Sequence, residues 1–383
     1  MKVAHLTSVH PVVDTRILHK QAATLAAAGH EVVLVAVAEG DAVLRGVRLR
    51  AIRGGGGRGR RMTAVALRVL RAALAERADV YHFHDPELIP VGLALKLAGR
   101  RVIYDVHEDV PAQVLSKHWI HPRLRGPVAR ATALLEGATA RLFDAVVVAN
   151  PAHADRYPAA RTVAVRNLPD LAEFAGAGPG AAAREPAAIY VGDLTRARGA
   201  LEMVRAMALL PPACPARLWL GGRFSEPGLE AACRAEPGWA RVDFLGWVDR
   251  AQLAARLARA RLGLVLLHPV PHYQANYPVK LFECMAAGVP VVASDLPLCR
   301  EVVEGAGCGL LVDPRDPAAI AGALAWLLDH PEAAAAMGAR GRAAVEQRYT
   351  WASEARTLLA LYGRLGPALP AAARPSCDLR GTS

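Results

Sequence analysis

The sequence predicts an α/β protein built of two Rossmann-like domains that face an interdomain cleft. Apolar segments of strand length alternate with amphipathic helical segments along the whole chain, which is typical of parallel sheets. The chain has 383 residues, a length that exceeds one ordinary domain, and 53% of the residues are hydrophobic, which is enough to fill two cores. A stretch rich in Gly, Ala and Pro at 167–186 interrupts the alternation, so we interpret it as an interdomain linker.

The first half of the chain, residues 1–166, is expected to form the N-terminal domain. Its strands are predicted at Lys2–Thr7, Glu31–Val37, Asp79–Phe83, Arg101–Asp105, Asp144–Ala149 and Thr162–Val165. Its helices are predicted near Arg16–Ala28, Met62–Ala78, Glu87–Ala98 and Leu124–Phe143. Gly29 follows the first of these helices at the position of a C-cap.

Residues 187–348 are expected to form a second domain of the same kind. Its strands are predicted near Ala187–Gly192, Arg217–Gly221, Val242–Leu245, Gly263–Leu267, Val289–Ala293 and Gly309–Val312. Its helices are predicted near Arg198–Leu210, Arg250–Arg259, Val279–Ala287, Pro317–Asp329 and Pro331–Arg348. A last helix within 349–366 is expected to pack back on the N-terminal domain, and 367–383 to be a disordered tail.

Composition narrows the class of partner. The net charge is +11, which favours phosphorylated small molecules or an anionic membrane surface. Zinc-finger spacing and RNA-binding signatures are absent from the sequence, so no nucleic-acid partner is expected. The six cysteines form no CxxC pair and resemble reduced core thiols. No long apolar run or signal peptide is found, so we expect a cytoplasmic protein.

The most informative segment is Asn276–Ser294, which reads NYPVKLFECMAAGVPVVAS. A Tyr-Pro turn precedes a short helix that carries Lys280 and Glu283, and an apolar strand follows. This order places a carboxylate, a cation and a helix N-terminus at the carboxyl edge of a parallel sheet, where α/β folds bind nucleotides. Isolated Glu and Lys residues would instead fit an ordinary surface helix, but the combined string favours a nucleotide site.

This segment resembles the donor-binding region of the retaining glycosyltransferases of family 4. The resemblance spans nearly the whole chain, up to about Gly366. It implies the two-domain GT-B architecture, with residues 1–166 as the acceptor domain and residues 187–348 as the nucleotide-sugar donor domain. It also assigns Glu283 to the ribose of a sugar nucleotide. The family usually carries a second glutamate ahead of this position, but Ala275 stands there in this chain. Asn276 is a candidate to take the role of the missing glutamate. The resemblance also assigns the backbone near Val248 to the nucleobase.

The segment YVGDLTRARG, Tyr190–Gly199, resembles the part of the family that directs two cations at the donor diphosphate. Arg198 matches the lysine of the family, whereas Asp193 stands where an arginine is expected. Arg196 lies close enough in sequence to supply the second cation. Guanidinium groups bind phosphate oxygens bidentately, which suits stabilisation of the leaving group. A solvated basic turn is the alternative.

Two histidine-rich segments of the N-terminal domain, HFHDPEL and IYDVHEDVP, follow adjacent predicted strands. One interpretation is a metal centre, because His82 and His84 share one face of an extended segment and Asp105 or His107 can complete the set. The other is a sugar-binding site. The spacing matches no common zinc pattern. IYDVHED resembles the family segment that carries an active-site histidine, which implies that His107 is catalytic.

Further residues of the N-terminal domain are candidates for contacts with acceptor or phosphate. The first strand is followed by SVHPVVDTRIL, in which Asp14 and Arg16 stand at a helix start. A simple capping role for Asp14 is the alternative. His84 and Asp85 are candidates for the same contacts.

The resemblance implies a retaining transferase of the hexosyltransferase type (EC 2.4 class). It would move a sugar from a nucleotide-sugar, expected to be a UDP-sugar, to a saccharide or lipid-linked acceptor in polysaccharide or cell-envelope glycan assembly. No DxD pair follows a strand, so neither metal nor cofactor is expected, and the leaving phosphate would take the acceptor proton. Alternatives are a sugar-nucleotide epimerase, a metal-dependent hydrolase, and a catalytically silent nucleotide-binding scaffold that Ala275 and Asp193 would fit. The basic segments 53–62 and 116–130 suit an anionic membrane, which favours a peripheral position at the inner face of the plasma membrane.

Overall fold

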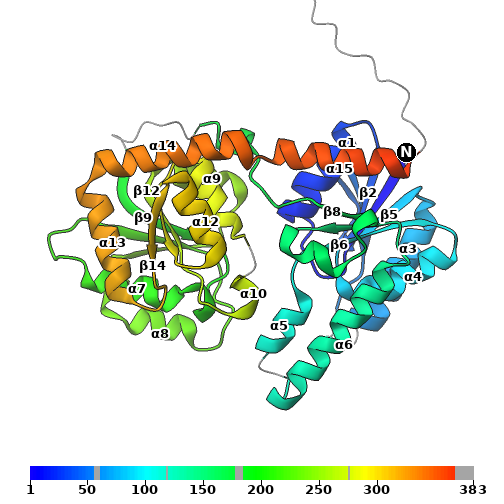
Figure 1. The fold of residues 1–383 in the computed structure, drawn as a ribbon, viewed down its shortest axis with the longest axis horizontal. Helices are drawn as coiled ribbons and strands as arrows, with labels where there is room; N and C mark the ends of the chain where they lie inside the picture. Colours follow the sequence, from blue (N-terminus) through cyan, green and yellow to red (C-terminus); the bar gives the residue numbers. More distant parts are fainter. Residues whose placement is uncertain (56–60, 118–119, 177–183, 275–276, 367–383) are drawn as a thin grey trace, which may run out of the picture. The chain divides into compact units, whose positions relative to one another are not determined.

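The computed structural model describes residues 1–55, 61–117, 120–176, 184–274 and 277–366. The chain divides into two compact units. The first unit contains Met1–His107, Arg130–Val165 and the segment from Ala355 onward, and the second contains Glu108–Ala129 and Arg166–Glu354. The segment from 108 to 129, expected in the N-terminal domain, therefore groups with the second unit. Each unit is a sheet of mainly parallel strands with helices on both faces (Figure 1).

The first unit is built on an eight-stranded sheet in the order β3-β4-β2-β1-β5-β6-β7-β8. Its strands are β1 (Lys2–Leu6), β2 (Glu31–Val37), β3 (Ala42–Leu44), β4 (Val47–Ile52), β5 (Val80–Phe83), β6 (Arg101–Val106), β7 (Ala145–Val148) and β8 (Thr162–Ala164). All neighbouring pairs are parallel except β3 with β4. The chain runs outward from β1 on one side and then crosses to β5 on the other. The topological switch point, where open α/β sheets bind ligands, therefore lies between β1 and β5.

The two faces of this sheet differ in chemistry. One face is apolar, and its core includes Phe83, whose ring lies 4.7 Å from that of Tyr104 and 5.2 Å from that of Phe143. The other face carries the buried histidines His5 and His82.

The helical segments of the first unit are η1 (Thr15–Ala22), α1 (Ala23–Ala27), η2 (Arg61–Val65), α3 (Ala66–Glu76), η3 (Pro86–Leu88), α4 (Ile89–Leu97), η4 (Pro151–Arg156), η5 (Ala159–Arg161) and most of α15 (Trp351–Leu365). Helix α6 (Pro122–Ala140) begins in the segment grouped with the second unit. The helix predicted after β1 is observed as the π-helix η1 followed by α1.

The second unit is built on a six-stranded parallel sheet in the order β11-β10-β9-β12-β13-β14. Its strands are β9 (Glu185–Val191), β10 (Arg217–Gly221), β11 (Val242–Gly246), β12 (Ala260–Val265), β13 (Val291–Ser294) and β14 (Gly309–Val312). Its helical segments are α5 (Val110–Ser116), η6 (Leu171–Phe174), η8 (Arg196–Arg198), α7 (Ala200–Leu209), α8 (Leu229–Ala235), η9 (Pro237–Arg241), α9 (Arg250–Arg259), α10 (Pro271–Gln274), α11 (Val279–Ala286), α12 (Pro297–Ala306), α13 (Pro317–Asp329) and α14 (Pro331–Arg348). The switch point of this sheet lies between β9 and β12.

The segment interpreted as a linker is largely part of the second unit. Leu168 and Phe174 are buried in its core. The guanidinium of buried Arg184 donates to the carbonyl oxygens of Leu257, Ala260 and Ala287. Only 177–183 of the expected linker lie outside the described residues. Composition alone missed the two apolar anchors, because Gly, Ala and Pro dominate the residues around them.

Candidate active site

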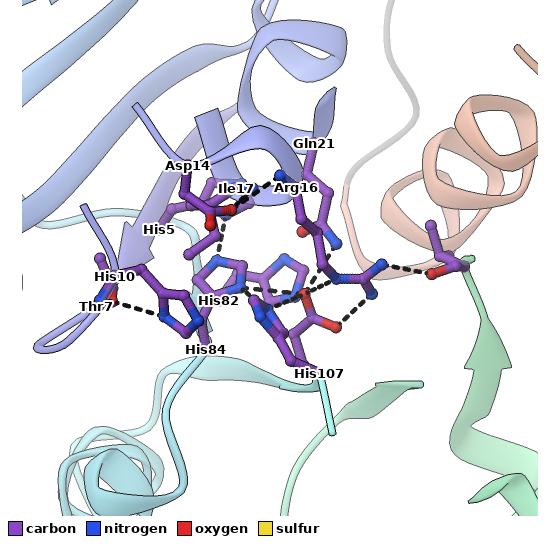
Figure 2. A network of polar contacts seen from close by, with 12 residues as sticks. His5, Thr7, His10, Asp14, Arg16, Ile17, Gln21, His82, His84 and His107 are labelled. Carbon is purple, nitrogen blue, oxygen red and sulfur yellow. Dashed lines mark hydrogen bonds and ion pairs between the residues drawn. The ribbon is translucent and has the colours of Figure 1, made fainter. Parts of the chain in front are cut away.

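Polar side chains occupy one face of three adjacent strands in the first unit. In the register of the sheet, His5 of β1 lies beside His82 of β5, which lies beside Ile103 of β6. Side chains two residues apart on a strand share a face, so His84 and Asp105 project from this face one step nearer the carboxyl edge. His107 follows β6 directly. We call His5, His82, His84, Asp105 and His107 the histidine cluster (Figure 2).

Asp105 is the anionic centre of the histidine cluster and is fully buried. Arg16, from the π-helix η1, donates through Nη2 to Oδ1 at 2.6 Å and through Nε to Oδ2 at 3.0 Å. Gln21 of the same helix donates to Oδ2 at 2.8 Å. Burial alone would raise the pKa of Asp105, but the charges of Arg16 and His107 hold it well below its ordinary value. Asp105 is therefore ionised at neutral pH.

This anion fixes the protonation of the neighbouring imidazoles. Nδ1 of His84 lies 3.1 Å from Oδ2 of Asp105 and 3.0 Å from Nε2 of His107. In the tautomer that donates from Nδ1 to the carboxylate, Nε2 of His84 accepts from Nδ1 of His5 at 2.8 Å. Burial lowers the pKa of His84 to about 3 and that of His5 well below its ordinary value, which keeps both rings neutral. Nε2 of His107 lies 3.0 Å from the same carboxylate oxygen. This network leaves Nδ1 of His107 for other partners.

Two groups of the histidine cluster have the spacing of metal ligands. Within each group, His5-His82-His84 and His84-Asp105-His107, ligand atoms lie within 4.8 Å of one another. The ring planes of His5 and His84 differ by only 12°, and their nitrogens are 2.8 Å apart, which is the geometry of an N–H···N hydrogen bond. In the other group, Asp105 already neutralises Arg16, whose charge would repel a cation. Hydrogen bonds therefore account for the arrangement of both groups.

A second Asp–His pair lies at the outer edge of the same strands. His10, in the loop after β1, places Nδ1 2.8 Å from Oδ1 of Asp85, which follows β5. Asp85 is buried, and its Oδ2 accepts from the backbone N–H of Ser8 at 2.5 Å and the hydroxyl of Thr7 at 2.9 Å. Burial would raise the pKa of Asp85, but hydrogen bonds from His10, Ser8 and Thr7 lower it to about 2. Sequence reasoning missed His10, because no motif surrounds it.

The structure assigns different roles to several predicted contact residues of the first unit. His107 remains partly accessible, with 14% of its side chain exposed. Asp14 caps η1 by accepting from the backbone N–H groups of Arg16 and Ile17, both at 2.8 Å. Arg16, His84 and Asp85 are buried and bonded to other protein groups, so they do not offer polar atoms to an acceptor. Sequence reasoning missed the burial of these three residues, because residue type does not indicate burial.

In the second unit, Glu283 projects from α11 and is 6% exposed. It forms an ion pair with Arg250, the first residue of α9, and Arg250 also pairs with Glu173. The ion pairs hold the carboxylate of Glu283 in one orientation. Sequence reasoning missed Arg250 and Glu173, because they lie in separate segments on either side of β9 and β10.

Two cations lie together near the carboxyl end of β9. Lys280 lies against Gly192, where a Cβ atom would come within 2.4 Å of the Lys280 Cε, and its ammonium lies 5.4 Å from the ring centre of Tyr190. Nε of Arg198 donates to the hydroxyl of Tyr273 at 3.0 Å. Burial and the charge of Arg198 lower the pKa of Lys280 to about 8. Two neighbouring, partly buried cations favour an anionic ligand.

The remaining predicted donor contacts are less closely grouped. Arg196 is exposed and pairs with Glu226, with Nε 3.8 Å from the carboxylate. Val248 is half-buried in the loop after β11, and its Cγ2 packs against the end of β10 at Gly221. Asn276, and with it Ala275, lies outside the described residues. The structure thus brings Lys280 and Arg198 together but places Arg196 at the surface.

Comparison with known families agrees with this arrangement. The family described as Glycosyl transferases group 1 matches residues 185–330, and the Glycosyl transferase 4-like domain matches residues 15–168. The chain therefore belongs to the group 1 glycosyltransferases. This confirms the family and the class of enzyme predicted from the sequence. A curated relative, the phosphatidyl-myo-inositol mannosyltransferase of Mycobacterium leprae, is 27% identical over 319 residues, which cover 78% of this glycosyltransferase and 77% of the relative.

Solved structures confirm the predicted two-domain α/β fold. Sucrose-phosphate synthase from Thermosynechococcus elongatus matches with a TM-score of 0.76 and 23% identity, covering 95% of this glycosyltransferase and 98% of that chain. HepE from Anabaena, in a complex with UDP-glucose, matches with a TM-score of 0.72 and 17% identity, covering 95% and 100%. These likenesses place the chain among GT-B folds.

Proposed function

We propose that this glycosyltransferase transfers a sugar from a nucleotide-sugar, with a UDP-sugar as the expected donor, to a saccharide or lipid-linked acceptor. The proposal rests chiefly on the neighbouring cations Lys280 and Arg198 at the switch point of the second sheet. Their position suits the diphosphate of a nucleotide. HepE, which shares the fold, holds UDP-glucose in its crystal structure.

The side chains of the second unit can perform the electrostatic part of such a reaction. Cleavage of the donor leaves negative charge on the nucleoside diphosphate, and Lys280 and Arg198 would stabilise that charge. The pKa of Lys280, about 8, keeps most of its ammonium protonated at neutral pH, and a bound anion would raise it further. With two cations in this role, we propose that the transfer needs no metal ion and no other cofactor.

Recognition of the nucleoside and of the sugar would fall to two further residues. We assign Glu283 to the ribose hydroxyls, with Arg250 holding its carboxylate in place. We assign His107 to the transferred sugar, because Asp105 holds its Nε2 and its side chain stays partly exposed at the carboxyl edge of the first sheet. Retention of configuration and a role in polysaccharide or cell-envelope glycan assembly complete the proposal and follow the sequence resemblance.

Thermal unfolding with sugar nucleotides tests this function. UDP-glucose at about 100 times its dissociation constant should stabilise the wild-type protein by about 2.7 kcal/mol, with or without EDTA. Glu283→Ala should bind about 10- to 100-fold more weakly, because hydrogen bonds to a charged group are lost. His107→Ala should keep the stabilisation while losing turnover.

Glu332→Ala is the matched control, since Glu332 is an exposed glutamate on α14. It should respond to UDP-glucose as the wild type does. GDP- and ADP-sugars belong in the same screen. A shift with only one of them would identify guanine or adenine, in place of uracil, as the nucleobase of the donor. No shift with any sugar nucleotide would contradict the proposal and favour a catalytically silent scaffold.

We also propose that the protein associates peripherally with an anionic membrane. Among the described residues, no helix combines the length and hydrophobicity that crossing a bilayer requires. Helix α6 instead exposes an apolar stripe, because Leu124, Val128 and Leu135 follow helical spacing and all three are exposed. Exposed Arg123 and Arg130 flank it. The basic loop 53–62 lies partly outside the described residues, so the proposal rests on α6.

Sedimentation with lipid vesicles tests the membrane proposal. The protein should pellet with vesicles of phosphatidylcholine and phosphatidylglycerol at low salt, and added salt should release it, because each basic residue near the surface contributes about 1 kcal/mol. The double variant Leu124→Ser, Leu135→Ser should remain in solution. Leu97→Ser is the control, since Leu97 on α4 is 91% exposed but lies outside α6. No pelleting of the wild type at low salt would overturn the proposal.

A further inference from the structure

Asp193 lies beside the two cations of the second unit, although it carries the opposite charge. It follows Gly192 at the carboxyl end of β9, and its Oδ2 lies 3.4 Å from Nη1 of Arg198. The side chain of Asp193 is 62% exposed, whereas that of Arg198 is 25% exposed. An anion that pairs with Arg198 therefore also comes close to the carboxylate of Asp193.

The backbone that carries this carboxylate is anchored on both sides. The hydroxyl of buried Tyr190 donates to the carbonyl oxygen of Asp193 at 2.8 Å. The next residue, Leu194, is fully buried, and its backbone N–H donates to the carbonyl oxygen of Arg223 at 2.9 Å. The position of Asp193 is therefore set by the fold before a ligand arrives, although its side chain faces solvent.

The charge of Asp193 acts on both cations. Burial and the charge of Arg198 lower the pKa of Lys280 to about 8, whereas the carboxylates of Glu283 and Asp193 act in the opposite direction. Burial would also lower the pKa of Arg198, but its neighbour Tyr273 and the carboxylate of Asp193 raise it. Asp193 therefore cancels part of the positive charge that the two cations offer to an anionic ligand.

The donor and the product of the proposed reaction differ in charge at this place. When the bond between the anomeric carbon and the phosphate oxygen breaks, its electron pair stays on the nucleoside diphosphate, and the phosphate oxygen takes the acceptor proton. A terminal phosphate loses such a proton to water with a pKa of about 6, so free UDP carries one more negative charge than UDP-glucose at neutral pH. A neighbouring carboxylate therefore repels the product more strongly than the donor.

We propose that Asp193 determines the selectivity of the donor site and favours the nucleotide-sugar over the free nucleoside diphosphate. The inference rests on the proposed transferase function, in which the diphosphate pairs with Arg198 and Lys280. Asp193 weakens the binding of both ligands, but it weakens that of the product more, and this promotes release of the product after transfer. An arginine at this position, which the sequence resemblance predicts, would instead attract both ligands.

Isothermal titration calorimetry of the full-length protein tests the inference, with UDP-glucose and UDP or with the same pair for the nucleobase that the unfolding screen identifies. The measured quantity is the dissociation constant of the product divided by that of the donor. Asp193→Asn should bind both ligands more tightly and lower this ratio by about 3- to 5-fold, the upper range for an exposed charge pair. A general change in the shape of the site would move both constants and leave the ratio unchanged.

Two further variants and a change of pH complete the experiment. Asp193→Glu keeps the charge and should keep the wild-type ratio. Asp243→Asn is the matched control, since Asp243 also pairs with an arginine, Arg217, but lies on the edge strand β11, and its ratio should equal that of the wild type. At about pH 5 the terminal phosphate of UDP keeps its proton, so the difference between wild type and Asp193→Asn should shrink.

The outcomes separate this inference from the function on which it rests. If the wild type binds a nucleotide-sugar and Asp193→Asn keeps the wild-type ratio, the role of Asp193 is overturned and the transferase function stands. The same holds if Asp193→Glu lowers the ratio as much as Asp193→Asn does, because shape rather than charge would then decide. If the wild type binds no sugar nucleotide, both fall.

Discussion

Asp105→Asn should lower the free energy of unfolding by about 3–5 kcal/mol, the usual cost of removing one partner from a buried ion pair. Four side chains lie at hydrogen-bond distance from the carboxylate and act as donors to it: Arg16, Gln21, His84 and His107. An amide of the same shape would leave the buried guanidinium without a counter-charge and turn a donor toward other donors. Urea denaturation of the two proteins measures the difference as a change in midpoint.

The same variant has a matched control and an internal check. Asp41→Asn removes a carboxylate that pairs with Arg50 at 2.9 Å on the surface, where solvent screens the pair, so its midpoint should barely move. In a double-mutant cycle, Arg16→Gln combined with Asp105→Asn should cost less than the sum of the single changes, because neither buried charge then remains alone. An additive cycle, or an Asp105→Asn midpoint equal to the wild type, would contradict the role assigned to this pair.

The effect should also depend on pH in a defined direction. The pKa of Asp105 in the folded protein is held well below 3.8, its ordinary value. The ionised carboxylate therefore contributes its full stabilisation at every pH above that ordinary value. This stabilisation is lost as the pH falls through the lowered pKa, because the folded state must then take up a proton. The gap between wild type and Asp105→Asn should therefore be constant near neutrality and narrow only below about pH 4.

Local patterns in the sequence were enough to find part of the histidine cluster. His82 and His84 alternate on one strand, and Asp105 and His107 repeat the alternation on the next, so the period of two residues by itself indicates a shared face. Their partners were not predictable in this way. Tyr362, whose hydroxyl lies 2.8 Å from Nδ1 of His82, is 280 residues away in the sequence. No local pattern connects them.

Other differences have equally specific causes. Arg16 and Asp14 were interpreted as ligand contacts because both are charged and stand at a helix start, yet one is a buried counter-ion and the other a cap. Burial of an arginine depends on a carboxylate 89 residues away, which local sequence does not reveal. The strand β4, with the sequence VRLRAI, was missed although its residues alternate, because its arginines resemble a solvated basic segment.

Gly222→Ala should be as damaging as the loss of Asp105, for a steric reason. Gly222 follows β10 with φ +133, a conformation that L side chains rarely adopt, and a Cβ there would lie 1.8 Å from the carbonyl oxygen of Gly192. Backbone strain of about 1–3 kcal/mol adds to a clash of about 1–3 kcal/mol. Urea denaturation should therefore show a loss of several kcal/mol, unless the loop after β9 moves away.

Movement of that loop would itself be informative, because it connects stability with donor binding. Backbone hydrogen bonds join the ends of β9, β10 and β11, with Gly192 donating to Gly221 at 3.0 Å and Gly222 donating to Gly246 at 2.6 Å. The loop after β9 carries Arg198, and Lys280 lies against Gly192. Displacing Gly192 would separate the two cations, so Gly222→Ala should also lose stabilisation by UDP-glucose.

Gly228→Ala separates the steric effect from a general cost of replacing glycine in the left-handed region. Gly228 has φ +74, and an added Cβ would meet no atom within 4 Å. This variant should lose only the strain of about 1–3 kcal/mol and keep its response to UDP-glucose. Equal losses of stability and nucleotide response in the two variants would show that close contact between Gly192 and Gly222 does not maintain the cation pair. A loss confined to Gly222→Ala would instead connect the bare backbone at these strand ends to the position of Arg198 and Lys280.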